Sequence, residues 1–192
     1  MFIYNLHGKQ LITVEHLKNN LKLHPVQKSM IEYGGSQCGF CTPGFIMSMF
    51  SMFKNKIKPN KENIDEQLAG NLCRCTGYNS IYLATKNMYS YWQLDHFSKT
   101  EKKIINKLKS IKNKDVVINT LDKEFFIPSN LDSLKENINQ SKDYHLLSGG
   151  TDLALEVTKK RKSLGSIIYL GNNHDLKHIK VLNNNTWLWI NS

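Results

Sequence analysis

SQCGFCTPG (residues 36–44) and GNLCRCTGY (residues 70–78) hold all four cysteines of this 192-residue chain. The four cysteines follow the spacing C-x2-C, then 31 intervening residues, then C-x-C. The chain opens MFIYNLHGKQ, without the basic leader and apolar run of a secretory signal, so we expect a cytoplasmic protein. Clustered thiols in that setting bind metal more often than they pair as disulfides. The pattern therefore predicts a four-cysteine iron–sulfur or zinc site.

Ligand spacing separates these two alternatives. Zinc ribbons usually use two C-x2-C pairs, whereas the second pair here is C-x-C. The spacing also differs from the C-x4-C-x2-C run of plant-type ferredoxins. We therefore favour a [2Fe–2S] centre, and a structural zinc-binding interaction module without redox activity remains the alternative.

Charge and composition argue against several other classes of protein. The net charge is +10, but only Arg74 and Arg161 are arginines, and the lysines are scattered without interleaved aromatic residues. That distribution does not indicate a nucleic-acid partner. No apolar run approaches the roughly 18 residues that a membrane helix needs, so we expect no membrane partner. Since no nucleophile–base or paired-carboxylate arrangement stands out, we predict no catalytic residue in this chain.

The first half of the chain carries helical signals. Residues 2–17 hold two short β-branched runs around a turn and predict a strand pair. Helix starts follow at Pro25, Thr42–Pro43, Asn60 and Tyr78–Asn79. Each cysteine pair thus lies in a loop just before a helix, where unpaired N–H groups stabilise an anionic centre. We expect a four-helix module in which two loops meet over one metal centre.

The second half is mixed. Residues 98–120 are lysine-rich and predict a linker with a short helix. Strands are expected at 116–118, 125–127, 144–147, 167–170 and 187–190, with helices from Pro128–Ser129 onward and at 153–160. The turn SGGTD (148–152) lies between a strand and a helix, where backbone N–H groups can hold a pyrophosphate. Most Gly-Gly turns only permit a backbone geometry, so the turn alone is weak evidence.

The stretch HGKQLITVEHL, followed by LHPVQKSMIEYGGSQCGFCTPGFIMSM and LAGNLCRCTGYNSI, closely resembles the xanthine dehydrogenase/aldehyde oxidase family of molybdenum hydroxylases. FFIPSNLDSLKENI and LLSGGTDLALEVTKK resemble the start of that family's FAD domain. Iron–sulfur and flavin segments in this order resemble the small subunit of bacterial xanthine dehydrogenase.

The resemblance implies a set of site residues. Cys38, Cys41, Cys73 and Cys75 would bind a [2Fe–2S] cluster, and Gln37 and Cys75 would lie against the molybdopterin of a separate large subunit. The FAD pyrophosphate segment would consist of Leu146, Leu147, Ser148, Gly149, Gly150, Thr151, Asp152 and Leu153. Electrons from purine oxidation, most simply of xanthine or hypoxanthine, would pass through the cluster toward FAD and NAD. The chain would be an electron conduit within an oxidoreductase complex.

The resemblance also implies a domain plan and a fold class. Residues 1–17 would be the remnant of an N-terminal ferredoxin-like domain, 18–97 a helical [2Fe–2S] domain, 98–120 a linker, and 121–192 the truncated start of an FAD-binding domain. The expected class is therefore α followed by α+β, a four-helix domain and the beginning of an α+β domain, in a fragment of a longer subunit.

Overall fold

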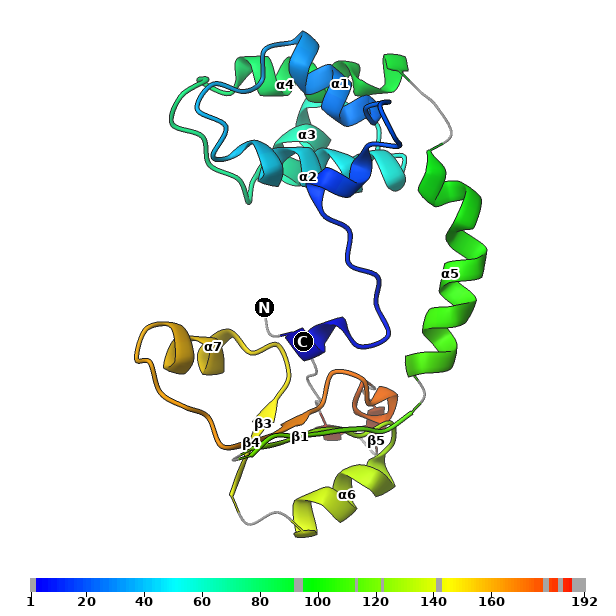
Figure 1. The fold of residues 1–192 in the computed structure, drawn as a ribbon, viewed down its shortest axis with the longest axis vertical. Helices are drawn as coiled ribbons and strands as arrows, with labels where there is room; N and C mark the ends of the chain where they lie inside the picture. Colours follow the sequence, from blue (N-terminus) through cyan, green and yellow to red (C-terminus); the bar gives the residue numbers. More distant parts are fainter. Residues whose placement is uncertain are drawn as a thin grey trace. The chain divides into compact units, whose positions relative to one another are not determined.

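The structure, a computed structural model, describes residues 3–91, 95–112, 114–121, 123–140, 143–177, 180–182 and 185–187 (Figure 1). The chain forms two compact units. One consists of residues 11–101, and the other combines residues 1–10 with residues 102–192. No helix within the described ranges is long and apolar enough to cross a membrane.

The first unit is helical. It contains the 3₁₀ helices η2 (Val14–Leu17) and η3 (Met88–Tyr91), the start of α5 (His96–Lys112), and the helices α1 (Pro25–Glu32), α2 (Thr42–Lys54), α3 (Lys61–Leu68) and α4 (Asn79–Asn87). Helix α1 begins at Pro25, whose fixed φ and missing N–H suit a first helical position. The Asn60 side chain caps α3 by accepting from the N–H of Asn63.

Buried apolar side chains from all four α helices form the core of the helical unit. Phe45, Met49, Met52 and Phe53 on α2 are almost completely buried, at the spacing of one helix face. They pack with Leu17, Val26, Met30, Ile64, Ile81, Met88 and Phe97. Burying such side chains removes apolar area from water and stabilises the unit by roughly 25 cal/mol per Å². The core therefore holds the two cysteine loops at fixed positions, because α2 and α4 both begin directly after them.

The predicted strand pair at residues 2–17 is wrong. Ile3–Leu6 forms the 3₁₀ helix η1, and Val14–Leu17 forms η2. The two runs belong to different units: Tyr4 stacks on Phe125 at a ring-centroid distance of 3.8 Å, whereas Leu17 is buried in the helical core. Each run is anchored by its own apolar packing, which replaces pairing between them.

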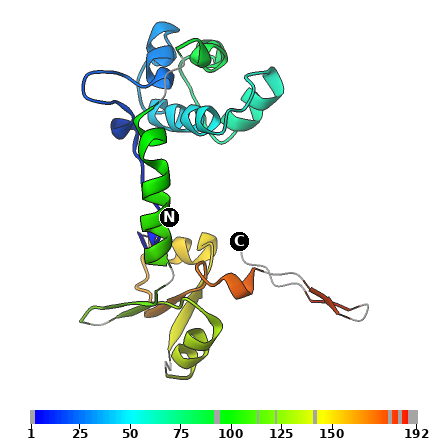
Figure 2. The same ribbon diagram turned by 90° about the vertical axis from the view of Figure 1, so that its right-hand side faces the viewer.

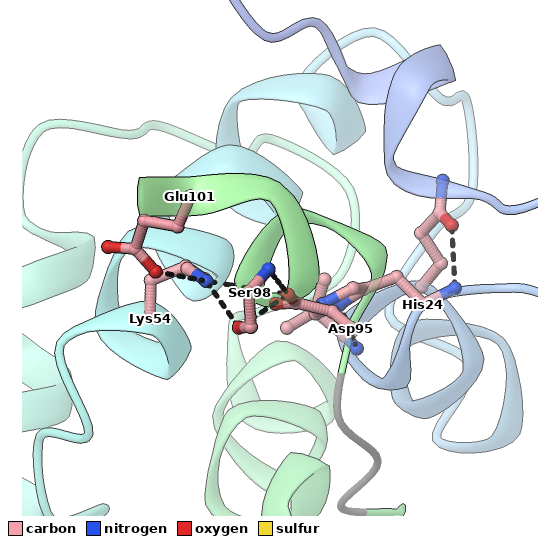
Figure 3. A network of polar contacts seen from close by, with 7 residues as sticks. His24, Lys54, Asp95, Ser98 and Glu101 are labelled. Carbon is pink, nitrogen blue, oxygen red and sulfur yellow. Dashed lines mark hydrogen bonds and ion pairs between the residues drawn. The ribbon is translucent and has the colours of Figure 1, made fainter. Parts of the chain in front are cut away.

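A buried polar network closes the helical unit (Figure 3). Asp95 Oδ1 accepts hydrogen bonds from Ser98 N and Ser98 Oγ, both at 2.7 Å, and from Lys54 Nζ at 3.4 Å. Asp95 Oδ2 lies 3.6 Å from Nε2 of His24, and both side chains are almost fully buried. Glu101 Oε2 lies 3.8 Å from Lys54 Nζ at the exposed end of the network. The network joins the segment before α1, the end of α2 and the start of α5.

The second unit is a mixed sheet with a helix on each face (Figure 1). The sheet has the order β1-β2-β4-β3, in which β1 is antiparallel to β2 while β2, β4 and β3 are parallel. Its elements are β1 (Val116–Asn119), β2 (Glu124–Ile127), α6 (Leu131–Gln140), β3 (Tyr144–Leu147), α7 (Thr151–Thr158) and β4 (Ser166–Tyr169). After β4 follow η4 (His174–Leu176) and the two-stranded sheet of β5 (Lys180–Leu182) and β6 (Asn185–Trp187), which is seen clearly in Figure 2.

Successive side chains of β2 contribute apolar residues to both faces of the sheet. Phe125 and Ile127 pack with Leu153 of α7, whereas Phe126 packs with Leu134 of α6. Successive side chains of a strand point to opposite faces, so three consecutive apolar residues are all buried. The sheet is therefore sandwiched between α6 and α7.

The region expected to be a linker is largely helical. Helix α5 spans His96–Lys112, which is longer than the short helix predicted within residues 98–120, and β1 begins at Val116. Phe97, Ile104, Leu108 and Ile111 recur at helical spacing, and the lysines between them are good helix formers, which explains the long helix. The strand predicted at 187–190 is described only at Trp187, where β6 ends, and the rest lies outside the described residues.

Candidate metal centre

The four cysteines lie in two loops of the helical unit. Cys38 and Cys41 lie between α1 and α2, and Cys41 itself occupies the N-cap position of α2. Cys73 and Cys75 lie between α3 and α4. No side chain caps the N-terminus of either α2 or α4. The positive ends of two helices thus adjoin the two loops, as the sequence predicts.

The thiols are arranged as two pairs, one cysteine from each loop. Cys38 lies within hydrogen-bonding reach of Cys75, and Cys41 within reach of Cys73. The N–H of Phe40, and then the Cys75 thiol, lower the pKa of Cys38, while contact with Cys38 raises the pKa of Cys75. Burial, and then contact with Cys73, raise the pKa of Cys41. One thiol of each pair is therefore favoured as thiolate, the form that binds metal.

Thr76 is the strongest influence on Cys73. Its Oγ1 lies 3.2 Å from Cys73 Sγ, and its backbone N lies 3.5 Å from the same sulfur. The hydroxyl contact, followed by the backbone contact, lowers the pKa of Cys73 to about 7. Cys73 is therefore partly ionised near neutral pH, when an ordinary cysteine thiol with a pKa of about 8.5 is mostly protonated.

Tyr78 fixes the backbone of the second loop. It adopts a left-handed conformation with φ of +69°, directly after Gly77 with φ of +65°. Its hydroxyl accepts from Cys73 N at 3.0 Å, and its own N–H donates to Thr76 Oγ1 at 3.2 Å. A left-handed tyrosine is unfavourable by roughly 1–2 kcal/mol, and these two hydrogen bonds offset that strain by closing the loop around the Cys73 sulfur.

Asn71 connects the second loop to α2. Its Nδ2 donates to Ser48 Oγ at 2.8 Å and makes a weaker contact with Leu68 O at 3.4 Å. A Cβ atom at Gly44, in the first turn of α2, would lie 2.6 Å from Asn71 Oδ1. The absence of a side chain at Gly44 therefore allows the two cysteine loops to approach each other.

Two large apolar side chains flank the cysteines and are exposed. Phe40, between Cys38 and Cys41, is 96% exposed, and Leu72, next to Cys73, is 82% exposed. Gln37 is also exposed. The loops that carry the cysteines therefore leave large apolar side chains accessible to solvent.

The residues fit a cluster with two metal atoms. Four thiolates are the usual ligand set of a [2Fe–2S] centre, and two thiol pairs suit two irons. Within the described residues, no three or more His, Cys, Asp or Glu side chains come together closely enough to hold a metal ion, and the four thiols contact one another only in pairs. Donors to sulfur from Thr76 and from the N–H of Phe40 complete the fit, because hydrogen bonds stabilise a coordinated thiolate.

The predicted flavin segment lies in the second unit. Leu146 and Leu147 end β3, Ser148 and Gly149 form the turn, and Gly150 adopts φ of +80° before α7 begins at Thr151. Leu147 is completely buried, Leu153 of α7 packs against the sheet residues Phe125 and Ile127, and Thr151 and Asp152 are exposed. The turn therefore lies at the carboxyl end of a parallel strand, where open α/β sheets commonly bind ligands.

Sequence reasoning missed Thr76, Tyr78 and Asn71 as supports of the site. The signal for Thr76 was present, since a threonine three residues after a cysteine can donate to its sulfur through both its N–H and its hydroxyl. The roles of Tyr78 and Asn71 depend on a left-handed backbone and on packing across loops, which spacing does not reveal.

The comparisons with known proteins concern this same segment. A family model described as a [2Fe-2S] binding domain matches residues 13–86, which contain all four cysteines. Xanthine dehydrogenase 1 of Arabidopsis thaliana is 56% identical over 81 residues, or 41% of this chain. Aldehyde oxidase 3 of Mus musculus is 45% identical over 86 residues, or 44% of this chain. The chain spans 6% of the length of each of these relatives.

Among solved structures, quinoline 2-oxidoreductase of Pseudomonas putida 86 is 39% identical, with a TM-score of 0.38. The match covers 39% of this chain and 46% of that chain.

Proposed function

Because the chain carries the [2Fe-2S] binding domain of the xanthine dehydrogenase and aldehyde oxidase family, we propose that it transfers electrons within a molybdenum-containing hydroxylase. The observation that carries this proposal is the pairing of four thiols across two loops at two helix N-termini. Such a centre supplies one-electron transfer when the cluster is bound.

Cys38, Cys41, Cys73 and Cys75 are the proposed ligands. In this arrangement the contacting pairs, Cys38 with Cys75 and Cys41 with Cys73, would together hold the cluster. Thr76, and the N–H of Phe40, then keep the ligand sulfurs in the thiolate form by donating hydrogen bonds to them. Tyr78 fixes the second loop through its contact with Cys73 N, and Asn71 ties that loop to α2.

A molybdopterin-binding large subunit is the proposed partner. The exposed Phe40 and Leu72 beside the ligands supply an apolar surface for it, and Gln37 and Cys75 are the residues that we place nearest the pterin. Covering this surface would exclude water from the cluster, and burial around the sulfurs is one factor that sets a reduction potential. The partner would oxidise the substrate, for which we propose a purine such as xanthine or hypoxanthine.

We propose that the electrons pass from the cluster to FAD and then to NAD. Leu146 to Leu153 form the turn that we assign to the FAD pyrophosphate, with N–H groups at the start of α7 as donors and Gly149 and Gly150 allowing close approach. The test is quenching of flavin fluorescence by the full chain. Wild-type protein should quench FAD, and Gly150→Val should not, because valine is strained at φ of +80°.

Low-temperature EPR on the anaerobically reconstituted full chain tests the cluster. We expect no signal in the oxidised protein and a stoichiometric spin-half signal after dithionite reduction. Cys73→Ser should lose the signal while keeping the helical circular dichroism of the unit, and Ser51→Ala serves as a variant remote from the ligands. Protein that retains stoichiometric zinc and gives no signal would instead support the structural zinc module.

A further inference from the structure

The contacts around Thr76 assign it a role beyond shaping the loop. Its Oγ1 lies 3.2 Å from Cys73 Sγ, and its N–H points to the same sulfur at an N–S distance of 3.5 Å. The side chain is half-buried, so water does not replace this contact freely. Among the described residues that adjoin the sulfurs, Thr76 provides both a backbone and a side-chain donor to a single thiol.

The direction of the hydroxyl hydrogen bond follows from its neighbours. The N–H of Tyr78 donates to Thr76 Oγ1 at 3.2 Å, which occupies one lone pair of that oxygen. A cysteine bound to iron is a thiolate and has no proton to give. The proton shared between Thr76 and Cys73 must therefore come from the threonine hydroxyl.

We propose that Thr76 is a positioning residue that raises the reduction potential of the cluster by donating a hydrogen bond from its hydroxyl to the Cys73 sulfur. This inference rests on the proposed function, since it requires the cluster. Reduction adds one negative charge to the centre, so a donor to sulfur stabilises the reduced form more than the oxidised form. Tyr78 holds the donor in place through its own N–H and through the hydroxyl contact with Cys73 N.

Redox titration of the reconstituted full chain, followed by the EPR signal, tests the proposal. Thr76→Val removes the hydroxyl but keeps the branched shape, Thr76→Ala removes both, and Thr76→Ser keeps the hydroxyl. At the wild-type midpoint potential, we expect the ratio of oxidised to reduced cluster to rise on the order of tenfold in the valine and alanine variants, which is about 59 mV for one electron. The serine variant should stay close to the wild type.

Each result separates this proposal from the function on which it rests. Absence of a cluster in the wild-type chain removes the proposed function, and the role of Thr76 with it. Clusters in every variant with one shared potential overturn only the role of Thr76. Failure of both hydroxyl-free variants to assemble, while Thr76→Ser assembles normally, also overturns it, because the hydroxyl would then serve assembly and not potential.

Discussion

At the scale of single residues, His24 is a buried titratable group in the helical core, beside Asp95 (Figure 3). Its Nδ1 accepts from Val26 N at 3.3 Å and so caps α1, while its ring packs edge-on against Phe50 and Phe53. Burial lowers the pKa of His24, although Asp95 beside it opposes that shift. Protonation of Nδ1 would also remove the acceptor that caps the helix.

The sign of the resulting pH dependence follows from this lowered pKa. A histidine in the unfolded chain takes up a proton as the pH falls through about 6.5, whereas the fold resists protonation. The free energy of unfolding should therefore be highest above pH 6.5 and fall as the pH drops from there through the lower pKa of the folded state. Urea unfolding followed by circular dichroism, between pH 8 and pH 5, measures this slope.

His24→Asn is the matched variant for that measurement. Asparagine can cap α1 through its side-chain oxygen but does not titrate. The variant should be less stable at every pH, because it loses the packing against Phe50 and Phe53. Its loss of stability on acidification should be smaller than that of the wild type. Equal slopes in the two proteins would show that His24 does not control the acid sensitivity.

Part of the cysteine site can be predicted from the sequence alone. Cysteine spacing and helix start signals place all four thiols in two loops before α2 and α4. They do not reveal the pairing of Cys38 with Cys75, because that depends on how the loops approach each other in space. The second loop also has a left-handed backbone at Gly77 and Tyr78, and a left-handed tyrosine is not predicted by any local preference.

At the scale of elements, the contact between α2 and the second loop depends on one missing side chain. Gly44→Ala should destabilise the helical unit by about 1–3 kcal/mol, although alanine is the better helix former. The new Cβ would lie 2.6 Å from Asn71 Oδ1, and Asn71 cannot move without losing its hydrogen bond to Ser48. Urea unfolding of the variant and of the wild type measures the difference in their free energies of unfolding.

Two further variants make the Gly44 prediction specific. Gly70→Ala places a Cβ where no atom lies within 4 Å, so it should change stability by no more than about 0.5 kcal/mol. In an Asn71→Ala background, Gly44→Ala should lose most of its effect, since the two sites are coupled through this one contact. If the effects of Gly44→Ala and Asn71→Ala on the free energy of unfolding are additive, the contact between these two residues is not the cause of the destabilisation.

Elements differ in how well their sequence specifies them. The helix starts at Pro25, Thr42 and Asn60 carry local signals that need no tertiary context, and the structure begins α1, α2 and α3 there. The runs predicted as strands, residues 2–4 and 11–14, resemble strands by composition, but Tyr4 stacks on Phe125 whereas Ile12 and Val14 pack against the helical core. Tertiary burial overrides β-propensity in such short segments.

At the scale of the whole molecule, the helical unit extends beyond the segment that the family model matches. The match ends at residue 86, whereas the compact unit continues to residue 101. Asp95 and Phe97 lie in this extension and are both buried: Asp95 binds Ser98 and Lys54, and the Phe97 ring lies 5.4 Å from that of Phe50. The start of α5 therefore closes the core.

This closure predicts that residues 11–112 fold alone and bind the cluster. The fragment contains every buried residue of the helical core, all four cysteines and the whole of α5. After reconstitution it should give the same spin-half signal as the full chain and unfold at the same urea concentration as the helical unit. A fragment without the signal, when the full chain shows one, would mean that the second unit is needed to hold the centre.

A shorter fragment, residues 11–91, is the matched control. It keeps the cysteines and η3 but lacks Asp95 and Phe97, so Lys54 loses a buried acceptor, His24 loses the carboxylate beside it, and the core loses an aromatic ring. Deleting a buried phenylalanine ring alone usually lowers the free energy of unfolding by about 3–5 kcal/mol. The control should therefore unfold at a clearly lower urea concentration than residues 11–112. If the two fragments are equally stable, α5 does not close the core, and the smaller segment matched by the family model is itself the folding unit.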